Sequence, residues 1–331
     1  MAGTAPAGDA RRPDPLCLHD LRGPQTGFLD DVLAGLAQLQ KRIPPKYFYD
    51  ADGSHLFEAI CALPEYYPTR AETALMDAHA GDMATRLGAA IQLIEFGSGA
   101  STKTQRLIDA ARPSRYVPID ISESALREAC SRLRAAYPHL LIHAVCADFN
   151  APLQLRAPIL ADDRPRVVYF PGSTIGNFTR AEARAFLQRV AALLGPGGRL
   201  LIGVDLKKDR AILEAAYNDA QGVTARFNLN LLERMNRELG ADFRIERFRH
   251  RAFYNAEQSR IEMHLDSRIA QTVRIAGREF SFRAGESIHT EISCKYGLAE
   301  FQDLGRAAGF DPLAVWTDAD GLFSVHLMQA A

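Results

Sequence analysis

Short apolar runs alternate with amphipathic segments through the middle of the chain. The apolar runs are residues 91–96, 115–119, 140–147, 166–172 and 199–206. Each has the length and composition of a buried strand, and the segments between them have helical spacing. One of these helices is expected to begin at Thr179-Arg-Ala-Glu182, which has the form of a capping box. The alternation predicts a mainly parallel sheet with helices on both faces.

The pattern before this series is helical. Residues 28–42 carry apolar positions at helical spacing, and we expect this helix to end before Pro44. Thr69-Arg-Ala-Glu72 has the form of another capping box and predicts a helix that continues to about residue 87. The first 20 residues are rich in Ala, Pro and Gly, so we expect a poorly ordered tail there.

The pattern changes again after Asp205. A helical stretch at about 208–239 precedes alternating runs that resemble strands. These runs are residues 242–254, 258–273 and 277–283. Antiparallel strands of this kind cannot continue a βαβ series, so they predict a smaller α+β lobe packed on or inserted into the main sheet. The final helix (298–309) and two strands (312–317 and 321–328) are expected to return to the main sheet as a hairpin.

These elements predict a division of the chain. Residues 1–20 would be the tail, and residues 21–90 a helical segment that contributes to the substrate site. Residues 91–206 and 298–331 would form the main cofactor-binding domain, and residues 207–297 the α+β lobe that binds the substrate.

Composition makes a small molecule the expected partner. The 331 residues are 47% hydrophobic, and 39 Lys and Arg nearly cancel 40 Asp and Glu, so no strong field attracts nucleic acid or a membrane surface. The start lacks the apolar core of a signal peptide, and no apolar run is long enough to span a bilayer. Five scattered cysteines suit reduced thiols and give no metal-ligand spacing. We therefore expect a cytoplasmic monomer without a metal site.

Candidate chemistry lies where the predicted strands end, because open α/β sheets bind ligands at the carboxyl ends of their strands. The first strand ends in Glu95-Phe-Gly97-Ser-Gly99, and glycines let the backbone turn sharply and approach a ligand. The third glycine of a dinucleotide motif is missing, since position 102 is Thr, which argues against a nicotinamide dehydrogenase. Glycines of this kind can also serve only to shape the turn.

The next strand ends complete a nucleoside-type pattern. Asp120 can accept both ribose hydroxyls of an adenosine, although an aspartate before a helix can also be a cap. Asp148-Phe149 offers an acceptor for the adenine amino group and an apolar face for its ring. The loop Pro171–Asn177 follows the fourth strand, where a transferred group would emerge, or it is simply a polar turn.

Long runs of the sequence carry a resemblance. They are PPKYFYDADGSHLFEAI, LPEYYPTRAE, FGSGASTKT, PGSTIGNFT, AYNDAQGVTARFN, NRELGADF, RIEMHL and TEISCKY. From about residue 41 to 328 the chain resembles the histidine Nα-methyltransferase family of ergothioneine biosynthesis, which makes hercynine by three successive methylations. The resemblance implies a Rossmann-like class I methyltransferase sheet with an α+β substrate-binding lobe. It also implies S-adenosylmethionine as methyl donor, free L-histidine as substrate and no metal.

The same resemblance assigns residues to the two ligands. The positions that match S-adenosylmethionine contacts are Gly97, Lys103, Asp120, Asp148 and Phe149. The positions that match substrate contacts are Tyr66, Asn177, Tyr217, Met263, Glu291, Ile292 and Ser293. Asn177 and Tyr217 would hold the substrate carboxylate, and Glu291 and Ser293 would bind the imidazole. Tyr49 and Gly172 also fall in matching motifs and are expected near the amine, but no residue is assigned as a proton acceptor.

Simpler interpretations of these residues stay open. A buried Glu291 is costly unless it is paired, and the partner could be a ligand or an internal salt bridge. Tyr66 and Tyr217 could be core aromatics, and Met263 could be core filler. His264 and His289 have no partner at ligand spacing in the sequence, and the resemblance gives them no role. The basic run 244–251 alternates with apolar residues and suits a solvated strand face better than an RNA contact.

The predicted chemistry is direct in-line methyl transfer to the α-amine, with no covalent enzyme intermediate. One alternative is a methyltransferase of the same design that acts on another amino acid or a biogenic amine. Another is a catalytically silent S-adenosylmethionine-binding regulator.

Overall fold

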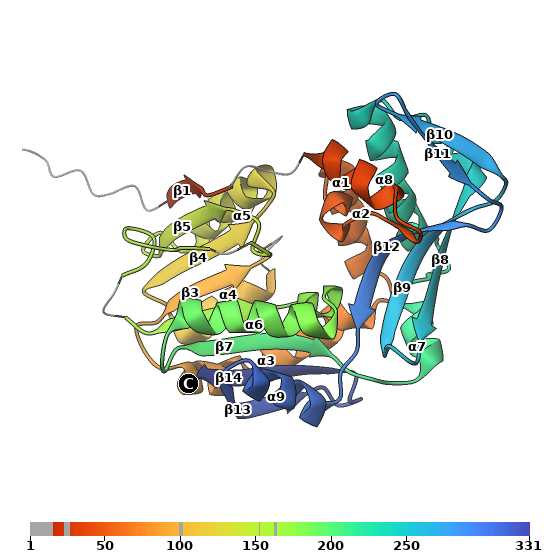
Figure 1. Cartoon of the computed structure of the whole chain (residues 1–331). Coiled ribbons are helices and arrows are strands. Elements are labelled where there is room, and N and C mark those ends of the chain that lie inside the picture. Colours follow the sequence, from red (N-terminus) through yellow and green to blue (C-terminus); the bar gives the residue numbers. More distant parts are fainter. Residues whose placement is uncertain (1–15, 23–26, 99–101, 152, 162–163) are drawn as a thin grey trace, which may run out of the picture.

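The computed structural model describes residues 16–22, 27–98, 102–151, 153–161 and 164–331. A large sheet sandwiched between helices lies beside a smaller lobe that has its own sheet (Figure 1). The large sheet has eight strands over the described ranges, in the order β1-β5-β4-β3-β6-β7-β14-β13. Its strands are β1 (Leu16–Asp20), β3 (Gln92–Phe96), β4 (Arg115–Asp120), β5 (Leu141–Cys146), β6 (Arg166–Phe170), β7 (Arg199–Asp205), β13 (Phe310–Thr317) and β14 (Phe323–Ala330).

The direction and burial of these strands agree with the predicted sheet. β1 and the strands from β3 to β7 pair in parallel, and the β13–β14 hairpin is antiparallel and joins β7 through β14. Every residue of β3 is buried, as expected for a parallel strand covered on both faces. The predicted sheet and its C-terminal hairpin are therefore confirmed.

Helices cover both faces of the large sheet. They are α3 (Tyr67–Leu87), α4 (Thr102–Ala111), α5 (Glu123–Ala136), α6 (Arg180–Leu194) and α9 (Leu298–Ala307). Side chains of α3, α4 and α5 form one hydrophobic core with the strands, and side chains of α6 and α9 form another core on the opposite face. The capping box of α6 is confirmed, because the Thr179 side chain and the Glu182 side chain each bond the other residue's backbone.

The prediction of a tail to about residue 20 is wrong for residues 16–20. These residues form β1, which pairs in parallel with β5 from Leu16 and Ile142 to Asp20 and Cys146. A five-residue edge strand has too short an alternation to stand out beside a Pro- and Gly-rich start. The rest of the predicted tail, residues 1–15, lies outside the described residues.

Two helix boundaries also differ from the prediction. The first helix, α1 (Phe28–Leu36), ends well before Pro44, because the chain turns back at Gly35, whose backbone packs against the carbonyl of Arg42. The capping box predicted at Thr69 is wrong, because α3 already begins at Tyr67 with Pro68 in its first turn. Glu72 therefore lies inside the helix, where it is buried and available for other partners.

The smaller lobe is built on a sheet in the order β2-β12-β9-β8. Its strands are β2 (Lys41–Arg42), β8 (Phe248–Asn255), β9 (Arg260–Ser267) and β12 (Ser287–Cys294), with a separate hairpin of β10 (Gln271–Ile275) and β11 (Arg278–Phe282). Helices α1, α2 (Ala51–Cys61), α7 (Arg210–Ala215) and α8 (Val223–Leu239) complete it. The helix predicted at 208–239 is thus two helices, since Gly222 has a positive φ and Asp219 accepts the first amides of α8. The strand β12 was not predicted.

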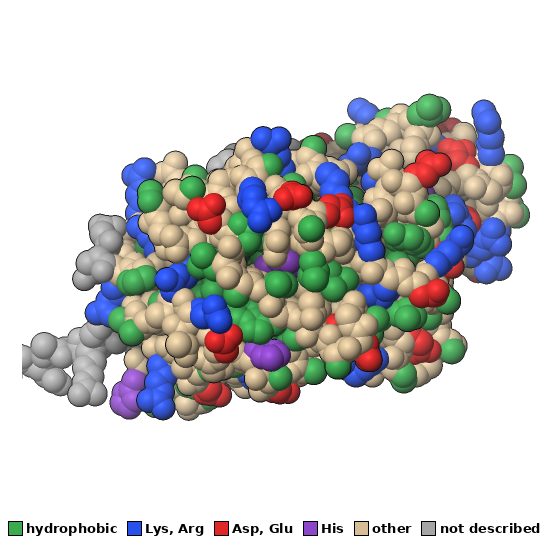
Figure 2. Space-filling view, turned by 90° about the horizontal axis from the view of Figure 1, so that it is seen from below, with side chains coloured by type: hydrophobic (Ala, Val, Ile, Leu, Met, Phe, Trp, Pro, Cys, Tyr) green, Lys and Arg blue, Asp and Glu red, His purple; other side chains and the backbone are tan. Residues whose placement is uncertain are grey.

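The charges on the surface are mixed, as the nearly equal numbers of basic and acidic residues predict (Figure 2). Basic and acidic side chains are interspersed on the face that Figure 2 shows, rather than gathered by sign. Of the helices in the described part of the chain, none is long and apolar enough to cross a membrane.

Phe227 anchors the N-terminal segment in the smaller lobe, and its removal tests that core. This buried residue of α8 stacks on Phe48 at 4.6 Å between ring centroids and contacts the rings of Tyr49 and Phe57. We expect Phe227→Ala to lower the free energy of unfolding by about 3–5 kcal/mol, measured by urea denaturation. The exposed Leu39→Ala is the control and should change it by less than about 0.5 kcal/mol. Equal effects of the two variants would contradict this packing.

Candidate active site

Three of the residues matched to the cofactor meet at the carboxyl ends of β3, β4 and β5. Gly97 follows β3 with a positive φ of 68°, and its amide donates to the Ile119 carbonyl of β4 at 2.8 Å. A side chain on Gly97 would lie 3.7 Å from the ring of Phe149, which follows β5. Asp120 is the last residue of β4, between these two loops. Gly99, the second glycine of the motif, lies outside the described residues.

The two strand-end carboxylates are held by their own backbones. Asp120 accepts the Ser122 amide at 2.9 Å, and Asp148 accepts the Asn150 amide at 2.9 Å. The side chain that caps α5 belongs to Ser122, so the helix-cap interpretation of Asp120 is wrong. Both carboxylates are thereby oriented at the edge of the sheet where an adenosine is predicted.

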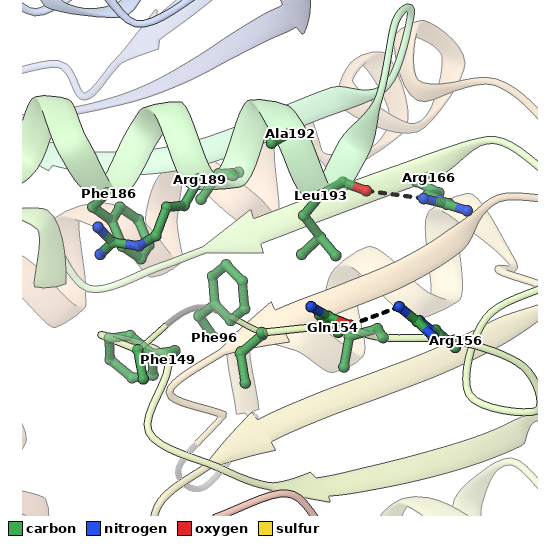
Figure 3. Close-up of a pocket in the computed structure, with 13 residues that line it drawn as sticks. Phe96, Phe149, Gln154, Arg156, Arg166, Phe186, Arg189, Ala192 and Leu193 are labelled. Carbon is green, nitrogen blue, oxygen red and sulfur yellow. Dashed lines mark hydrogen bonds between the residues drawn. The ribbon is translucent and has the colours of Figure 1, made fainter. Parts of the chain in front are cut away.

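Phe149 belongs to an aromatic cluster beside a groove. Its ring lies 5.8 Å from that of Phe96 and 6.3 Å from that of Phe186 of α6. Figure 3 shows Phe186 of α6 on one side of a groove and Phe96 and Phe149 together on the other side. The groove lies between α6 and the loop after β5 and has a volume of about 360 Å³. Arg156 and Arg166 lie at its far end, where Arg166 donates to the Leu193 carbonyl at 2.9 Å. The cluster fixes the apolar wall on which a planar base could stack.

Glu72 links the predicted cofactor contact Lys103 to the loop after β6. Its fully buried carboxylate forms an ion pair with Lys103 and accepts the Gly172 amide at 2.9 and 3.1 Å. Gly203 of β7 lacks a side chain where this carboxylate packs, and a Cβ there would collide with it. The sequence missed this role because Glu72 was assigned to a capping box. Its position in α3, facing both elements, could not be inferred locally.

The loop from Pro171 to Asn177 is folded tightly against β12. Gly172 and Ser173 both have a positive φ, and the Asp205 amide donates to Ser173 Oγ at 2.9 Å. The following turn, η2 (Thr174–Asn177), packs on β12, where a Cβ on Gly176 would lie only 3.0 Å from the Cys294 carbonyl. Glycine at 176 therefore allows Asn177 to approach the strand that carries Glu291 and Ser293.

A β-bulge in β12 decides which side chains face the site. His289 pairs with His264 of β9, and Glu291 pairs with the next residue, Met263, so Thr290 is the extra residue. The Thr290 hydroxyl donates to the Met263 carbonyl at 3.1 Å and stabilises the bulge. As a result Glu291 lies on the same face as Met263, and His289 lies on the opposite face.

The half-buried side chain of Glu291 lies among tyrosines, and its carboxylate has no hydrogen-bond partner among the described residues. Burial raises the pKa of its carboxyl to about 7, and the charge of Lys295 only partly opposes this. Within the described part of the chain, its carboxylate makes no hydrogen bond or ion pair, so the internal salt-bridge alternative finds no support. The pKa of Tyr49 lies well above its usual value. Burial is the larger cause, and the negative charge of Glu291 is the next. The same carboxylate acts on Tyr66 and Tyr217, whose rings lie 6.3 Å apart.

A buried lysine connects these residues. Lys295 is fully buried and donates to Ser293 Oγ at 2.8 Å and to the Tyr217 hydroxyl at 3.4 Å. It also forms an ion pair with Asp205, at the end of β7, at 2.6 Å. Burial would lower the pKa of Lys295, but the charge of Asp205 holds this pKa above its usual value. The lysine lies in the matched run TEISCKY, but no local pattern indicates a role for it.

Asp205 is the acceptor at the centre of this network. Its carboxylate also accepts the Tyr67 hydroxyl at 2.9 Å and pairs with Lys208. Burial would raise the pKa of Asp205, but Lys295 and Lys208 hold it below its usual value. Burial lowers the pKa of Lys208 to about 8. The site therefore contains a fixed charge cluster behind the tyrosines and serines that line it.

Most, but not all, predicted substrate residues come together. Tyr66, Tyr217, Glu291 and Ser293 converge, and Met263 is buried beside Glu291. Ile292 does not join them, because its side chain points to the other face of β12 and packs on the core under the large sheet. Any ligand contact of this residue would have to come from its backbone.

The sequence spacing of His264 and His289 gave them no common partner, but the fold brings them together. Their rings stack at 4.7 Å, and Glu262 lies beside them. The sequence could not show this, because the pairing depends on the register of two separate strands, β9 and β12.

Known proteins resemble this chain over nearly its whole length. A family model described as histidine-specific, SAM-dependent methyltransferase matches residues 28–330. Histidine N-alpha-methyltransferase of Mycolicibacterium smegmatis is 45% identical over 303 residues, which is 90% of this chain and 93% of that protein. The protein of the same name from Mycobacterium tuberculosis is 42% identical with the same coverage. Ergothioneine biosynthesis protein 1 of Neurospora crassa is 30% identical over 87% of this chain and 33% of that protein.

The role of Glu72 can be tested with a matched pair of variants. Glu72→Gln removes the charge that pairs with Lys103, and we expect it to weaken S-adenosylmethionine binding by about 10-fold, measured by calorimetry. Glu182→Gln changes the same tetrapeptide motif where it caps α6, and should leave this affinity unchanged. Unaltered cofactor binding by a folded Glu72→Gln protein would show that this link is purely structural.

Proposed function

The chain belongs to the family of histidine-specific, S-adenosylmethionine-dependent methyltransferases, and we propose that it methylates the α-amino group of free L-histidine to hercynine. The observation that supports this substrate best is the half-buried carboxylate of Glu291, which has no hydrogen-bond partner among the described residues and lies beside hydroxyl groups that are already oriented. A ligand that donates an N–H group would satisfy it.

The residues at the carboxyl ends of β3 to β5 fit S-adenosylmethionine. Gly97 provides a turn free of a side chain under the ring of Phe149, and Asp120 and Asp148 offer oriented acceptors for ribose and adenine. Lys103, held by Glu72, would lie near the amino-acid end of the cofactor. The bound cofactor supplies a methyl group activated by a positively charged sulfur.

Glu291 and Ser293 match the two nitrogens of a neutral imidazole. Ser293 Oγ accepts a hydrogen bond from Lys295, an obligate donor, so the serine hydrogen is free to point elsewhere. The serine can then donate to the unprotonated nitrogen of the imidazole, while Glu291 accepts a hydrogen bond from the N–H group of the other ring nitrogen. This pair recognises one donor and one acceptor on opposite sides of a small ring, the pattern that distinguishes imidazole from an apolar side chain.

Asn177 and Tyr217 suit the substrate carboxylate. The Tyr217 hydroxyl accepts from Lys295 at 3.4 Å, which leaves its hydrogen for a carboxylate oxygen. The Asn177 amide at the end of η2 provides a second donor from the facing loop. The positive charge of Lys295 behind Tyr217 adds attraction for an anionic group.

Placement of the amine completes the reaction. With imidazole and carboxylate both held, the α-nitrogen is fixed between them, and the protein need only align it with the methyl group at near-attack distance. The absence of a side chain at Gly172 would help to make room for an ammonium that grows with each transfer, and Tyr49 lies close enough to Glu291 and Tyr217 for their charges to act on it. A neutral amine is required, so its proton must leave before each transfer.

Reciprocal variants test the two halves of the site. We expect Glu291→Ala to raise the dissociation constant of histidine about 10- to 100-fold, because a charge-assisted hydrogen bond is lost, while S-adenosylmethionine affinity stays within about two-fold. Asp120→Ala should do the reverse. Isothermal titration with each ligand measures both. An equal loss of both ligands in the Glu291 variant would contradict its assigned role.

A substrate panel separates the proposal from its alternatives. The protein is incubated with S-adenosylmethionine and histidine, histamine or phenylalanine, and products with one, two or three added methyl groups are identified by mass spectrometry. We expect histidine to be trimethylated. Histamine, which lacks the carboxylate, and phenylalanine, which lacks the imidazole, should react at least about 100-fold more slowly. Faster reaction of another amine would favour a different substrate, and bound cofactor without any product would favour a regulatory protein.

A further inference from the structure

We propose that Glu262, His264 and His289 form a binding site for a divalent transition-metal ion of the Zn²⁺ class, on the face of the small sheet opposite Glu291. The three side chains offer ligand atoms that all lie within 4.8 Å of one another. Two imidazoles and one carboxylate are a ligand set that zinc and its neighbours in the first transition row prefer. The site does not depend on the proposed methyl transfer.

The strand register creates this cluster. The bulge at Thr290 places His289 directly across from His264, and Glu262 lies two residues along β9 on the same face. The two imidazole rings stack with 4.7 Å between centroids and 15° between planes. The same bulge that turns Glu291 toward the substrate site therefore brings two imidazoles together behind it.

One edge of the cluster already has the spacing of two ligands on one ion. His264 Nε2 lies 3.3 Å from Glu262 Oε2. Two ligand atoms bound at about 2.0–2.2 Å to the same ion, with an angle of about 90–110° between them, lie about 3.0–3.5 Å apart. A metal ion would take the place of the proton shared by these atoms, and the neutral imidazole would keep its one proton on Nδ1, which would then donate to Ser287 Oγ.

The atoms of each ligand that would not bind metal are held by other groups. His264 Nδ1 is hydrogen-bonded to Ser287 Oγ at 2.9 Å, and His289 Nε2 to the Glu291 carbonyl at 3.1 Å. Hydrogen bonds of this type orient histidine ligands in metal sites. They leave His264 Nε2 and His289 Nδ1 as the nitrogens that can coordinate.

The carboxylate is anchored in the same way. Glu262 Oε1 accepts from Asn255 Nδ2 at 2.9 Å and from Arg260 Nε at 2.8 Å, which leaves Oε2 on the side of His264. His289 is only partly buried, so its ring can turn toward the ion, and solvent can complete the coordination.

The protonation states also suit a metal ion. Burial lowers the pKa of His264, and it lowers the pKa of His289 to about 4, so both rings are neutral near pH 7. Burial would raise the pKa of Glu262, but bonds from Arg260 and Asn255 hold it below its usual value. Of the neighbouring charges, Glu262 and Asp266 favour a cation and Arg251 and Arg260 oppose it. Asp266 is paired with Arg251 and Arg249.

Metal titration of the untagged full chain tests the site. The protein is treated with a chelator, dialysed and titrated with Zn²⁺ by calorimetry and with Co²⁺ by visible absorption, in the absence of histidine, which itself binds these ions. We expect one ion per chain with micromolar or tighter affinity, and a Co²⁺ spectrum typical of a low-coordinate site. His289→Ala and Glu262→Gln should each weaken binding at least about 10-fold.

The control is the other histidine pair of the described chain. His19 and His143 also stack, at 5.3 Å, with 3.0 Å between ring nitrogens, but no carboxylate completes a ligand set there. His19→Ala should leave Zn²⁺ affinity unchanged. Circular dichroism verifies the fold of each variant. Absence of Zn²⁺ binding by the unaltered protein, or equal binding by the folded His289→Ala and Glu262→Gln proteins, would overturn the proposal, whatever the outcome for methyl transfer.

Discussion

The buried ion pair between Lys295 and Asp205 is the interaction on which the geometry of the site depends. Asp205 ends a strand of the large sheet, and Lys295 directly follows the strand of the small sheet that carries Glu291. Both side chains are almost completely shielded from water. Desolvation of two charges offsets much of their attraction, so such a pair contributes little net stability unless further hydrogen bonds satisfy it. Here hydroxyl groups from both lobes supply those bonds, and the pair fixes one lobe against the other.

The same pair determines which groups can donate to a substrate. A lysine has hydrogens to give and no lone pair, so each hydroxyl it contacts must accept from it. Ser293 and Tyr217 both accept from Lys295, so the hydrogen of each hydroxyl is not used on the lysine and is left for another acceptor. Under the proposed assignment of these residues, specificity for an imidazole would follow from the polarity of this buried hydrogen-bond network, and Lys295 would act on the substrate through the residues that it orients.

Local sequence patterns predicted the parts of the structure that depend on near neighbours. Strands of the large sheet, the turn at Gly97 and the strand-end carboxylates Asp120 and Asp148 all follow from runs of a few residues. The resemblance to a family added residues of the small lobe, such as Glu291, that no periodicity would have selected. Glu72 was misassigned because a helix that starts three residues earlier gives the same residues a different place in the turn.

The features that were missed depend on register and on contacts between distant segments. Nothing in the run HTEISC indicates that Thr290 is a bulge, yet without it His289 and Glu291 would lie on one face of β12. Likewise, the partners of Lys295 come from segments separated from it by up to ninety residues. The entropic cost of bringing such distant segments together is offset by the packing of the whole core, so the sequence around each residue does not indicate the contact.

The fold holds Glu291 in an unfavourable electrostatic environment. The folded protein raises the pKa of Glu291 from 4.5 to about 7, so this group stabilises the fold least at high pH. In the unfolded chain the carboxyl loses its proton near its usual pKa, whereas in the folded chain it keeps the proton until about pH 7. Stability is therefore lost as pH rises from about 4.5 through 7, by on the order of 3 kcal/mol. An imidazole N–H directed at the carboxylate would stabilise its ionised form and recover part of that free energy. Binding of a ligand that directs an N–H group at Glu291 would therefore be coupled to deprotonation of this carboxyl group.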